Sequence, residues 1–439
     1  MAISDIKKIR LKKLEQIKKA GINPYPIKTK KTHSIEQALT EFDKLSEAKT
    51  EVVLAGRITA IREHGGSAFI NIDDGKNKIQ GFFKKDKLGD KKYQFFLDNF
   101  DVGDFVEISG SLFVTKRGEK TIEASDFNIL AKSLLPLPEK WHGLQDVEER
   151  FRKRYLDLIM NSEVRDKFRM RSKIVEELRN ILNGQDFLEV ETPILQPIPG
   201  GALALPFKTH LNALKMDLYL RVSPELYLKR LLVGGLEKIY EIGRCFRNEG
   251  MDKHHNPDFT MIELYWAYQN RDGLMDFVEK IMIDLIKKIK GGTKFTYEGK
   301  EIDFKAPWKR IKFGEFDFEK EKANIIQPTF VVDHPAKMAI LSKAKEDNPK
   351  EADRFQVVIG GIELINGFSE LNDSSEQEKR FKSAKIETER KDKDFLEALQ
   401  YGMPPAAGLG MGIDRLVALL TDSHSLREVI LFPTMKPQK

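Results

Sequence analysis

Two strand-like runs, EKIYEIGRCFRNEG and DFTMIELYWAY, stand close together in the second half of this chain, with only a short polar loop between them. Side chains of a strand alternate between two faces, so Phe259, Glu263 and Tyr265 of the second run share one face, together with Met261. The opposite face is apolar and is predicted to pack in a core; it consists of Ile262, Leu264 and Trp266. The two runs therefore predict a strand pair with one face on a core and the other on a polar cavity.

The polar residues of this pair are typical of a nucleoside triphosphate site. Arg247 can neutralise phosphate with two parallel hydrogen bonds, and His255 in the loop can reach the distal phosphates. Phe259 can stack on a purine, and Glu249 can accept a hydrogen bond from an exocyclic amine. The alternative is a salt-bridged hairpin, which explains the charges but not why charged and aromatic side chains share one face.

A second segment, GLGMGIDRLVALL from Gly408, supports the same site. Its glycines suggest a dinucleotide fingerprint, but Ile413 stands where the third glycine of GxGxxG belongs, so that interpretation fails. The glycines instead predict a strand that passes close to a ligand, and Arg415 opens the helix that follows.

The first part of the chain has a different pattern. From about Val52 to Leu130, short alternating runs are separated by turn signals such as DDGKN, DVGD and KRGEK. This predicts a small antiparallel β domain, either an OB barrel or another small barrel. Phe69 and Gln80 fall on adjacent predicted strands, where a ring and an amide can stack on a base and bind its edge, although aromatic residues on strands more often belong to a core.

The segment LPLPEKWHGL interrupts this pattern and is typical of a linker before a second domain. In that domain, residues 163–183 predict a long amphipathic helix, and FLEVETPIL then runs extended. The later strands and helices come in mixed order, without the regular alternation of a doubly wound sheet. The expected fold class is therefore α+β, with an antiparallel sheet flanked by helices.

Composition excludes several classes of protein. The chain has 439 residues, of which 41% are hydrophobic, enough for a sizeable core in two or three domains. No apolar run reaches the length of a membrane span and the N-terminus lacks a signal-peptide core, so we expect a cytoplasmic protein without membrane contact. The single cysteine, Cys245, excludes an internal disulfide and a cysteine-based zinc cluster.

Basic residues are concentrated in the first 33 positions, where lysines and Arg10 far outnumber Asp5 and Glu15. Apolar residues recur there at helical spacing, and the lysines cover the rest of the helix surface. This arm is either a solvated helix or a phosphate-binding surface for nucleic acid, whose affinity would depend on salt.

Three parts of the chain resemble the three motifs of class II aminoacyl-tRNA synthetases. They are the ETP element, the segment RNEG with Phe259 after it, and the segment GxGxGxDR. An N-terminal OB domain before such a core resembles the lysyl, aspartyl and asparaginyl subgroup, over essentially the whole chain. No segment like the HIGH or KMSKS motifs of class I enzymes occurs. The resemblance implies a basic helical arm (1–50), an OB-fold anticodon-binding domain (51–135), a linker (136–150) and a class II catalytic domain (151–439).

The remaining polar residues near the predicted site are acidic. Glu225 stands in the first turn of a helix predicted to have Ser223 as its N-cap and Pro224 as its first residue, where a carboxylate can also simply complement the helix dipole. Burying an ammonium group is costly unless it is paired, so Glu225, Glu263 and Glu370 together favour a substrate with two cationic amines. That substrate is lysine, since an aspartyl site would need an arginine or a lysine.

Similarity to the lysyl-tRNA synthetases of bacterial type implies roles for individual residues. The α-amino end of lysine is expected near Gly201, Glu225 and Glu263, the ε-amine near Tyr265 and Glu370, and the aliphatic stem against Phe368. The residues implied for ATP are Arg247, Glu249, His255, Asn256, Phe259 and Arg415, of which Arg247 and Arg415 are also expected to be catalytic. The residues implied for lysine are Gly201, Glu225, Glu263, Tyr265, Asn366, Phe368 and Glu370, and the last three lie on one predicted strand face. The residues implied for the anticodon are Phe69, Gln80 and Asp126, where Asp126 stands in place of the usual glutamate.

The chain is therefore expected to activate lysine with ATP and Mg²⁺, to release pyrophosphate, and to transfer lysine to the 3′ end of tRNA(Lys). Two alternatives stay open, an aspartyl or asparaginyl enzyme and a non-catalytic nucleic-acid-binding relative. A homodimer is expected because the long helix from Val164, with the strand that ends at ETP, resembles the dimer element of the family, and because the apolar stripe of this helix needs a partner. Packing of that stripe within the chain is the alternative.

The chain departs from the family pattern at three places. Leu205 stands where a basic residue is usual, and several dozen residues of a helical insertion are absent between FDFEKEK and NIIQPTF. Gln356 replaces the first of two carboxylates that usually hold Mg²⁺, whereas Glu363 is retained. We expect Mg²⁺ to arrive mainly with ATP and the ion near Gln356 to be weakened or lost, unless Gln356 is hydrogen-bonded away from the cavity. Since Glu363 and Asn366 would face opposite ways on a regular strand, both can reach the nucleotide only with a bulge between them.

Overall fold

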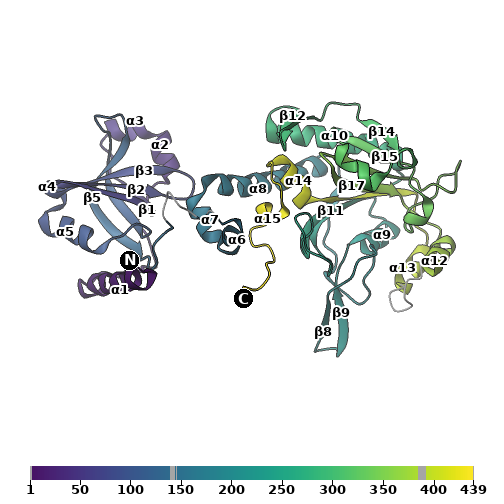
Figure 1. Cartoon of the computed structure of the whole chain (residues 1–439), viewed down its shortest axis with the longest axis horizontal. Helices are drawn as coiled ribbons and strands as arrows, with labels where there is room; N and C mark the ends of the chain where they lie inside the picture. The colour runs from purple at the N-terminus through teal and green to yellow at the C-terminus, as the bar shows by residue number, and fades with distance from the viewer. Residues whose placement is uncertain (1, 139–143, 145, 384–391, 439) are drawn as a thin grey trace. The chain divides into compact units, whose positions relative to one another are not determined.

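The computed structural model describes residues 2–138, 144, 146–383 and 392–438. The chain divides into two compact units, Met1–Gln145 and Asp146–Lys439 (Figure 1). Part of the predicted linker lies outside the described residues. None of the described helices is both long and apolar enough to cross a membrane.

The first unit is built on a closed barrel in the strand order β1-β2-β3-β5-β4, so the predicted small β-barrel is confirmed. Burial alternates along β2, where Ala68, Ile70 and Ile72 point into the barrel core, as the period of a strand requires. The barrel elements are β1 (Val52–His64), β2 (Ser67–Asp73), β3 (Lys78–Lys84), α4 (Lys85–Leu88), α5 (Asp90–Asn99), β4 (Phe105–Val114) and β5 (Lys120–Ala131).

The basic arm is part of this unit. It forms α1 (Ile3–Lys19), followed by α2 (Ile35–Thr40) and α3 (Phe42–Glu47). Leu14 and Ile17 are buried, and Arg10 donates hydrogen bonds to the carbonyls of Val102 and Leu135 at 3.0 and 2.9 Å. One face of α1 is therefore anchored within the unit, whereas most of its lysines are exposed.

The second unit contains an eight-stranded sheet in the order β14-β15-β16-β17-β18-β11-β10-β6. Its neighbouring strands are antiparallel except for the pairs β14–β15 and β10–β6, so the predicted α+β fold is confirmed. The strands are β6 (Leu188–Glu189), β10 (Lys238–Phe246), β11 (Asp258–Ala267), β14 (Lys309–Lys312), β15 (Thr329–Val332), β16 (Arg354–Ile359), β17 (Ile362–Ser369) and β18 (Ala406–Gly412).

Two smaller sheets and a set of helices complete this unit. The small sheets contain β7 (Leu195–Gln196), β8 (Lys208–Leu211) and β9 (Met216–Leu220), and β12 (Lys294–Tyr297) and β13 (Lys300–Asp303). The helices are α6 (Val147–Arg152), α7 (Arg154–Met160), α8 (Ser162–Asn183), α9 (Glu225–Val233), α10 (Arg271–Lys290), α11 (Phe318–Glu321), α12 (Ser374–Ser383), α13 (Lys393–Gln400), α14 (Ile413–Leu420) and α15 (Leu426–Val429).

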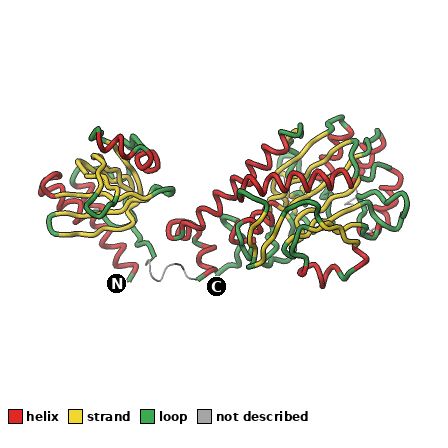
Figure 2. The backbone as a smooth tube through the Cα atoms, turned by 90° about the horizontal axis from the view of Figure 1, so that it is seen from above, coloured by secondary structure: helices red, strands yellow, loops and turns green. Residues whose placement is uncertain are grey.

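One face of the large sheet packs against α8, α10 and α14 in the main hydrophobic core; Figure 2 shows helices running along the strands of this unit. Ile262 and Leu264 of β11 are buried in this core, and Trp266 packs against it, as the alternation of that run predicted. The opposite face of β11 is thereby left for the polar side chains.

The long helix at 163–183 forms as predicted, but its apolar stripe does not need a second chain. Ile174, Leu178 and Leu182 are buried in the core of their own unit, where α8 packs against α10. The reason given above for a dimer is therefore wrong for this stripe, and packing within the chain accounts for it.

The connection that lacks the usual insertion is short. After α11, a single 3-10 turn (Lys322–Asn324) leads towards β15. Phe318 of α11 is buried in a small apolar cluster with Val331 of β15 and Val358 of β16. The shortened segment thus packs directly on strands at one side of the sheet.

Candidate active site

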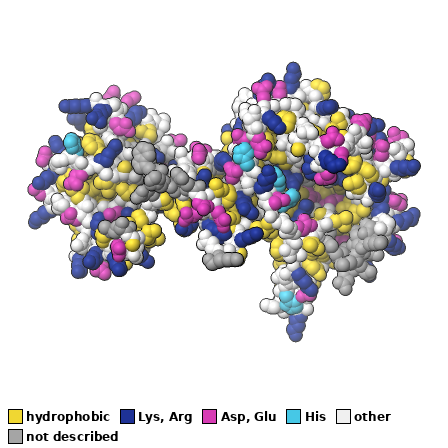
Figure 3. Space-filling view, in the orientation of Figure 1, with side chains coloured by type: hydrophobic (Ala, Val, Ile, Leu, Met, Phe, Trp, Pro, Cys, Tyr) yellow, Lys and Arg dark blue, Asp and Glu magenta, His cyan; other side chains and the backbone are white. Residues whose placement is uncertain are grey.

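A cavity of about 360 Å³ opens on the face of the large sheet opposite the core. It is lined by Phe259, Met261, Glu263 and Tyr265, the four residues that strand alternation placed on one face, so that prediction is confirmed. In Figure 3 the second unit is hollowed on the side shown, with acidic side chains inside the hollow.

Hydrogen bonds fix Glu263 at one end of the cavity. Ser223 donates to Glu263 Oε1 at 2.6 Å, and the Tyr265 hydroxyl donates to Oε2 at 2.9 Å. Burial and the nearby Glu225 carboxylate raise the pKa of Glu263 to about 7, while the two hydroxyl donors act in the opposite direction. This end of the cavity therefore holds a buried carboxyl group whose pKa lies close to neutral pH.

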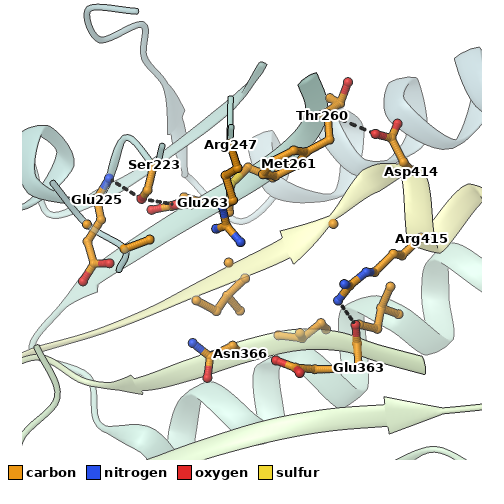
Figure 4. Close-up of a pocket in the computed structure, with 18 of the residues that line it drawn as sticks. Ser223, Glu225, Arg247, Thr260, Met261, Glu263, Glu363, Asn366, Asp414 and Arg415 are labelled. Atoms are coloured by element: carbon orange, nitrogen blue, oxygen red, sulfur yellow. Dashed lines mark hydrogen bonds between the residues drawn. The ribbon is translucent and has the colours of Figure 1, made fainter. Parts of the chain in front are cut away.

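The helix that carries Glu225 begins one residue later than predicted. α9 starts at Glu225, with Pro224 immediately before it. Ser223 still accepts a hydrogen bond from the backbone N–H of Glu225 at 3.1 Å, and it also donates to Glu263 (Figure 4). Ser223 therefore orients the carboxylate of Glu263 and holds the backbone at the start of α9, a role that the sequence reasoning missed.

Glu370 lies behind the cavity wall instead of lining it. It follows the last residue of β17 and is fully buried. A Cβ atom on Gly408 would collide with Glu370 Oε1 and with the ring of Tyr265, so only glycine allows β18 to pass here. The sequence placed Glu370 on one strand face with Asn366 and Phe368; the structure brings only these two into the cavity wall, because the strand ends before Glu370.

A lysine that the sequence reasoning overlooked contacts this carboxylate. Lys229 of α9 lies 2.7 Å from Glu225 Oε1 and 2.5 Å from Glu370 Oε2. Burial alone would lower the pKa of Lys229, but the carboxylates of Glu225 and Glu370 raise it above its usual value. The spacing of Glu225 and Lys229, four residues apart on a helix, was the available signal.

At the other end of the cavity, two arginines point into the same space from different elements (Figure 4). The guanidinium of Arg247 lies 5.1 Å from the centre of the Phe259 ring. Arg415, in the first turn of α14, donates to the backbone carbonyl of Glu363 at 2.8 Å, and its Nη2 lies 3.5 Å from His255 Nε2. Positive charge thus gathers opposite the carboxylates.

The loop between β10 and β11 closes this end. Glu249 Oε1 accepts a hydrogen bond from the backbone N–H of Leu205 at 3.3 Å, and the Leu205 carbonyl accepts one from Asn248 N at 2.7 Å. The Leu205 side chain itself is 60% exposed. The backbone at Leu205, where a basic residue is usual, is therefore hydrogen-bonded to the loop between β10 and β11. His255 and Asn256 both line the cavity as expected.

The bulge required on β17 is present. Val357 pairs with Ile365 and Val358 pairs with Glu363, so Leu364 is the additional residue between them. Glu363 and Asn366 consequently both line the cavity. Asn366 Oδ1 accepts a hydrogen bond from Arg354 Nε at 2.7 Å, which holds the amide in place.

Gln356 lies outside the described wall of this cavity. Its Oε1 is 2.7 Å from His334 Nε2, and both side chains are buried. Burial, with Arg354 nearby, lowers the pKa of His334 to about 4, so the ring is neutral at pH 7. A neutral amide bound to a neutral imidazole does not replace a carboxylate as a Mg²⁺ ligand, which favours the interpretation that Gln356 is bonded away from the cavity.

Without Gln356, the oxygen ligands left in the cavity fit one metal ion that is shared with a phosphate ligand. Among the described residues, no cluster of three or more His, Cys, Asp or Glu could hold a metal ion. Glu363 lies in the cavity wall, and its backbone carbonyl accepts a hydrogen bond from Arg415. A hard cation that keeps several waters needs few protein ligands when phosphate supplies the rest.

In the first unit, Phe69 and Gln80 lie on the adjacent strands β2 and β3, as predicted. Phe69 stacks on Phe82, with ring centres 4.7 Å apart, and Gln80 Oε1 accepts a hydrogen bond from Thr121 at 3.1 Å. Asp126 of β5 instead forms an ion pair with Lys92 of α5.

Comparisons with known proteins agree with both units. The model of the OB-fold nucleic acid binding domain matches residues 52–130, and that of the class II tRNA synthetases (D, K and N) matches residues 146–436. The chain therefore belongs to the class II tRNA synthetases of this group.

Relatives identify the branch of that group. The lysine–tRNA ligases of Carboxydothermus hydrogenoformans and Clostridium tetani are each 45% identical to the chain, over 99% and 98% of its length and 99% and 95% of theirs. The lysine–tRNA ligase of Fervidobacterium nodosum is 43% identical over 99% of the chain and 95% of its own length. Within its class, the chain belongs to the lysine–tRNA ligase family. The first match extends over 485 residues, more than the 439 of this chain, which agrees with the absence of an insertion.

Proposed function

We propose that the chain activates L-lysine with ATP, forming lysyl-adenylate and pyrophosphate, and then transfers lysine to the 3′ end of tRNA(Lys). The observation that supports this most is the division of charge in one cavity. Carboxylates gather at the end formed by Glu225 and Glu263, and arginines at the end formed by Arg247 and Arg415. A diamine bearing a carboxylate fits the first end, and a triphosphate fits the second.

The first step needs positioning more than proton transfer. The carboxylate of lysine is ionised at pH 7 and attacks the α-phosphorus of ATP, forming a new P–O bond as pyrophosphate leaves. No general base is required, because the nucleophile carries no proton. Arg247 and Arg415 stabilise the charge that develops on the phosphate oxygens.

The open end of the cavity suits the nucleotide. Phe259 provides a flat surface for the adenine, with Arg247 beside it. Glu249 accepts a hydrogen bond from the exocyclic amine, and His255 and Asn256 bind the distal phosphates together with Arg415. Glu363 is the residue that would hold a Mg²⁺ ion at this end, where the ion would supply neutralisation of phosphate charge.

The second step brings tRNA to the same cavity. The terminal adenosine hydroxyl attacks the mixed anhydride, which releases AMP. In the first unit, Phe69 stacks on an anticodon base, while Gln80 and Asp126 bind base edges. Charging tRNA for protein synthesis implies a cytoplasmic location.

The protein acts as a homodimer in this proposal. Leu188 of β6 and Leu195 of β7 are 53% and 46% exposed, and Ile194 between them is 44% exposed. These residues flank the ETP element, and three neighbouring exposed aliphatic side chains favour a contact with a second copy.

Exchange of labelled pyrophosphate into ATP, measured with each amino acid in turn, tests the activity. Exchange that depends on lysine supports the proposal. Exchange that depends on aspartate or asparagine would identify an enzyme of the neighbouring branches. No exchange with any amino acid, in a protein that still binds tRNA, would identify a non-catalytic relative.

A further inference from the structure

A buried lysine lies beside the proposed lysine site and takes no part in the steps above. Lys229 is fully buried, and its ammonium group touches both Glu225 and Glu370. It also lies 5.4 Å from the centre of the Phe368 ring, which lines the cavity. The protein thus keeps an amine of its own next to the place proposed for the amines of the substrate.

Glu370 has one oxygen left for a ligand. Lys229 contacts Oε2, whereas Oε1 lies against Gly408 and the Tyr265 ring, both of which line the cavity. Apart from the ion pair that Lys229 makes with Oε2, the carboxylate has no hydrogen-bond partner among the described residues, although the side chain is fully buried. A buried carboxylate oxygen without a donor is costly, so this atom favours the arrival of a donor from the cavity.

The charges at this end match a ligand with two amines. When ionised, the carboxylates of Glu225, Glu263 and Glu370 and the ammonium of Lys229 leave two negative charges uncompensated. L-lysine brings two ammonium groups, and its carboxylate is neutralised at the arginine end. Without Lys229, three negative charges would face two positive ones in a buried site, which is unfavourable.

We propose that Lys229 is a positioning residue for the amino acid: it favours the ionised form of Glu370, directs Oε1 of Glu370 towards the side-chain amine of the substrate, and sets the charge of the pocket to that of two amines. This inference rests on the proposed function, because the two amines are those of lysine.

Ionisation of the surrounding groups gives the inference a pH signature. Burial raises the pKa of Glu370 to about 8, and Lys229 opposes this rise; Lys229 also opposes the rise in the pKa of Glu263. The groups facing this cluster are Glu225 from α9, Glu263 and Tyr265 from β11, and Cys245 from β10, which faces Glu263. Removing Lys229 raises both carboxyl pKa values further. Protonated carboxyls cannot pair with ammonium groups, so lysine binding then requires a higher pH.

The test compares Lys229→Met with the wild type in pyrophosphate exchange between pH 6.5 and 8.5. We expect the KM for lysine to increase at pH 7 by about tenfold for each unit by which the carboxyl pKa rises. This increase becomes smaller as the pH rises, and the KM for ATP stays within about twofold of the wild type because the nucleotide end is unchanged. Lys229→Arg retains the charge and is expected to restore the wild-type pH profile in part.

A matched control is available in the first unit. Lys132 is also fully buried between two aspartates, Asp101 and Asp104. Lys132→Met is expected to leave the KM for lysine and its pH profile unchanged. A change in KM that is equal at every pH in Lys229→Met, or no change at all, would overturn the inference.

Calorimetry on the wild type tests the same idea without a variant. Lysine binding near pH 7 is expected to release protons, measured as a heat that depends on the ionisation enthalpy of the buffer. Binding without proton release between pH 6.5 and 8 would contradict the inference. If the wild type binds and activates no lysine, the proposed function itself fails, and the two failures are thereby distinguished.

Discussion

At the scale of single residues, we expect buried carboxylates to decide which amino acid this cavity favours. Glu370 is fully buried, and its carboxylate forms an ion pair with Lys229. Replacing it by a neutral residue leaves Lys229 with only Glu225 and is expected to remove the counter-charge proposed for the substrate amine. A change at this residue therefore acts on the substrate and on the protein together.

We predict that Glu370→Gln raises the KM for lysine roughly a hundredfold or more, since breaking a buried ion pair costs about 3–5 kcal/mol. ATP binding, measured by nucleotide titration, stays largely intact because Arg247, Phe259 and Arg415 lie at the other end of the cavity. The control is Glu378→Gln, an exposed carboxylate on α12. Equal loss of ATP and lysine affinity would show that Glu370 has a structural role instead.

Gln356 and Glu363 differ in their surroundings, and this leads to opposite expectations for Mg²⁺. Glu363 lines the cavity, whereas Gln356 is bonded to His334. We predict that Glu363→Gln increases the free Mg²⁺ needed for half-maximal exchange, while Gln356→Glu leaves it within about twofold. Titrating activity against free Mg²⁺ measures both. A lower Mg²⁺ requirement in Gln356→Glu would mean that this position does reach a metal site.

At the scale of secondary structure elements, the two faces of α1 have different surroundings. Its inner face is anchored by Arg10 and Ile17, and its outer face carries exposed lysines. Deleting residues 1–33 would uncover the core of the first unit, so the contribution of the arm to tRNA binding is tested better by changing surface charge alone.

We predict that changing the exposed lysines of α1 to glutamine weakens tRNA binding similarly for all tRNA sequences and makes its salt dependence less steep. Each phosphate contact that is lost reduces the slope by about one unit. Filter binding at several salt concentrations measures this, and lysine-dependent exchange is expected to stay unchanged. The substituted residues are Lys7, Lys8, Lys12, Lys18 and Lys19; the control set is Lys300, Lys305 and Lys309, exposed on the second unit. An unchanged slope would mean that the arm is only a solvated helix.

At the scale of the whole molecule, the apolar surface around the ETP element is the remaining argument for a dimer. We predict that light scattering at micromolar concentration gives twice the mass of the chain, and that Leu188→Glu shifts the mass to that of one chain. Leu214→Glu, at a site 68% exposed between β8 and β9, is expected to leave the dimer intact. A monomer mass for the wild type would reject the dimer.

Several features of the fold and of the cavity follow from the local stereochemistry of the sequence. The alternation of β10 and β11, the break between β18 and α14, and the need for a bulge between Glu363 and Asn366 all follow from how consecutive residues orient their side chains. The structure contains each of these features. For the same reason most of the predicted cavity residues line one cavity, because they lie on a few neighbouring strands and turns.

Only the tertiary structure decided which distant segments meet. The pairing of Lys229 with Glu370, the bond between Gln356 and His334, and the packing of α8 on α10 join parts of the chain whose separation carries no periodic signal. Each is set by how close-packed layers fill space and by where buried charges find partners. The sequence of α8 therefore predicted an apolar stripe but not what covers it, and the sequence near Glu370 predicted a carboxylate but not the lysine that holds it.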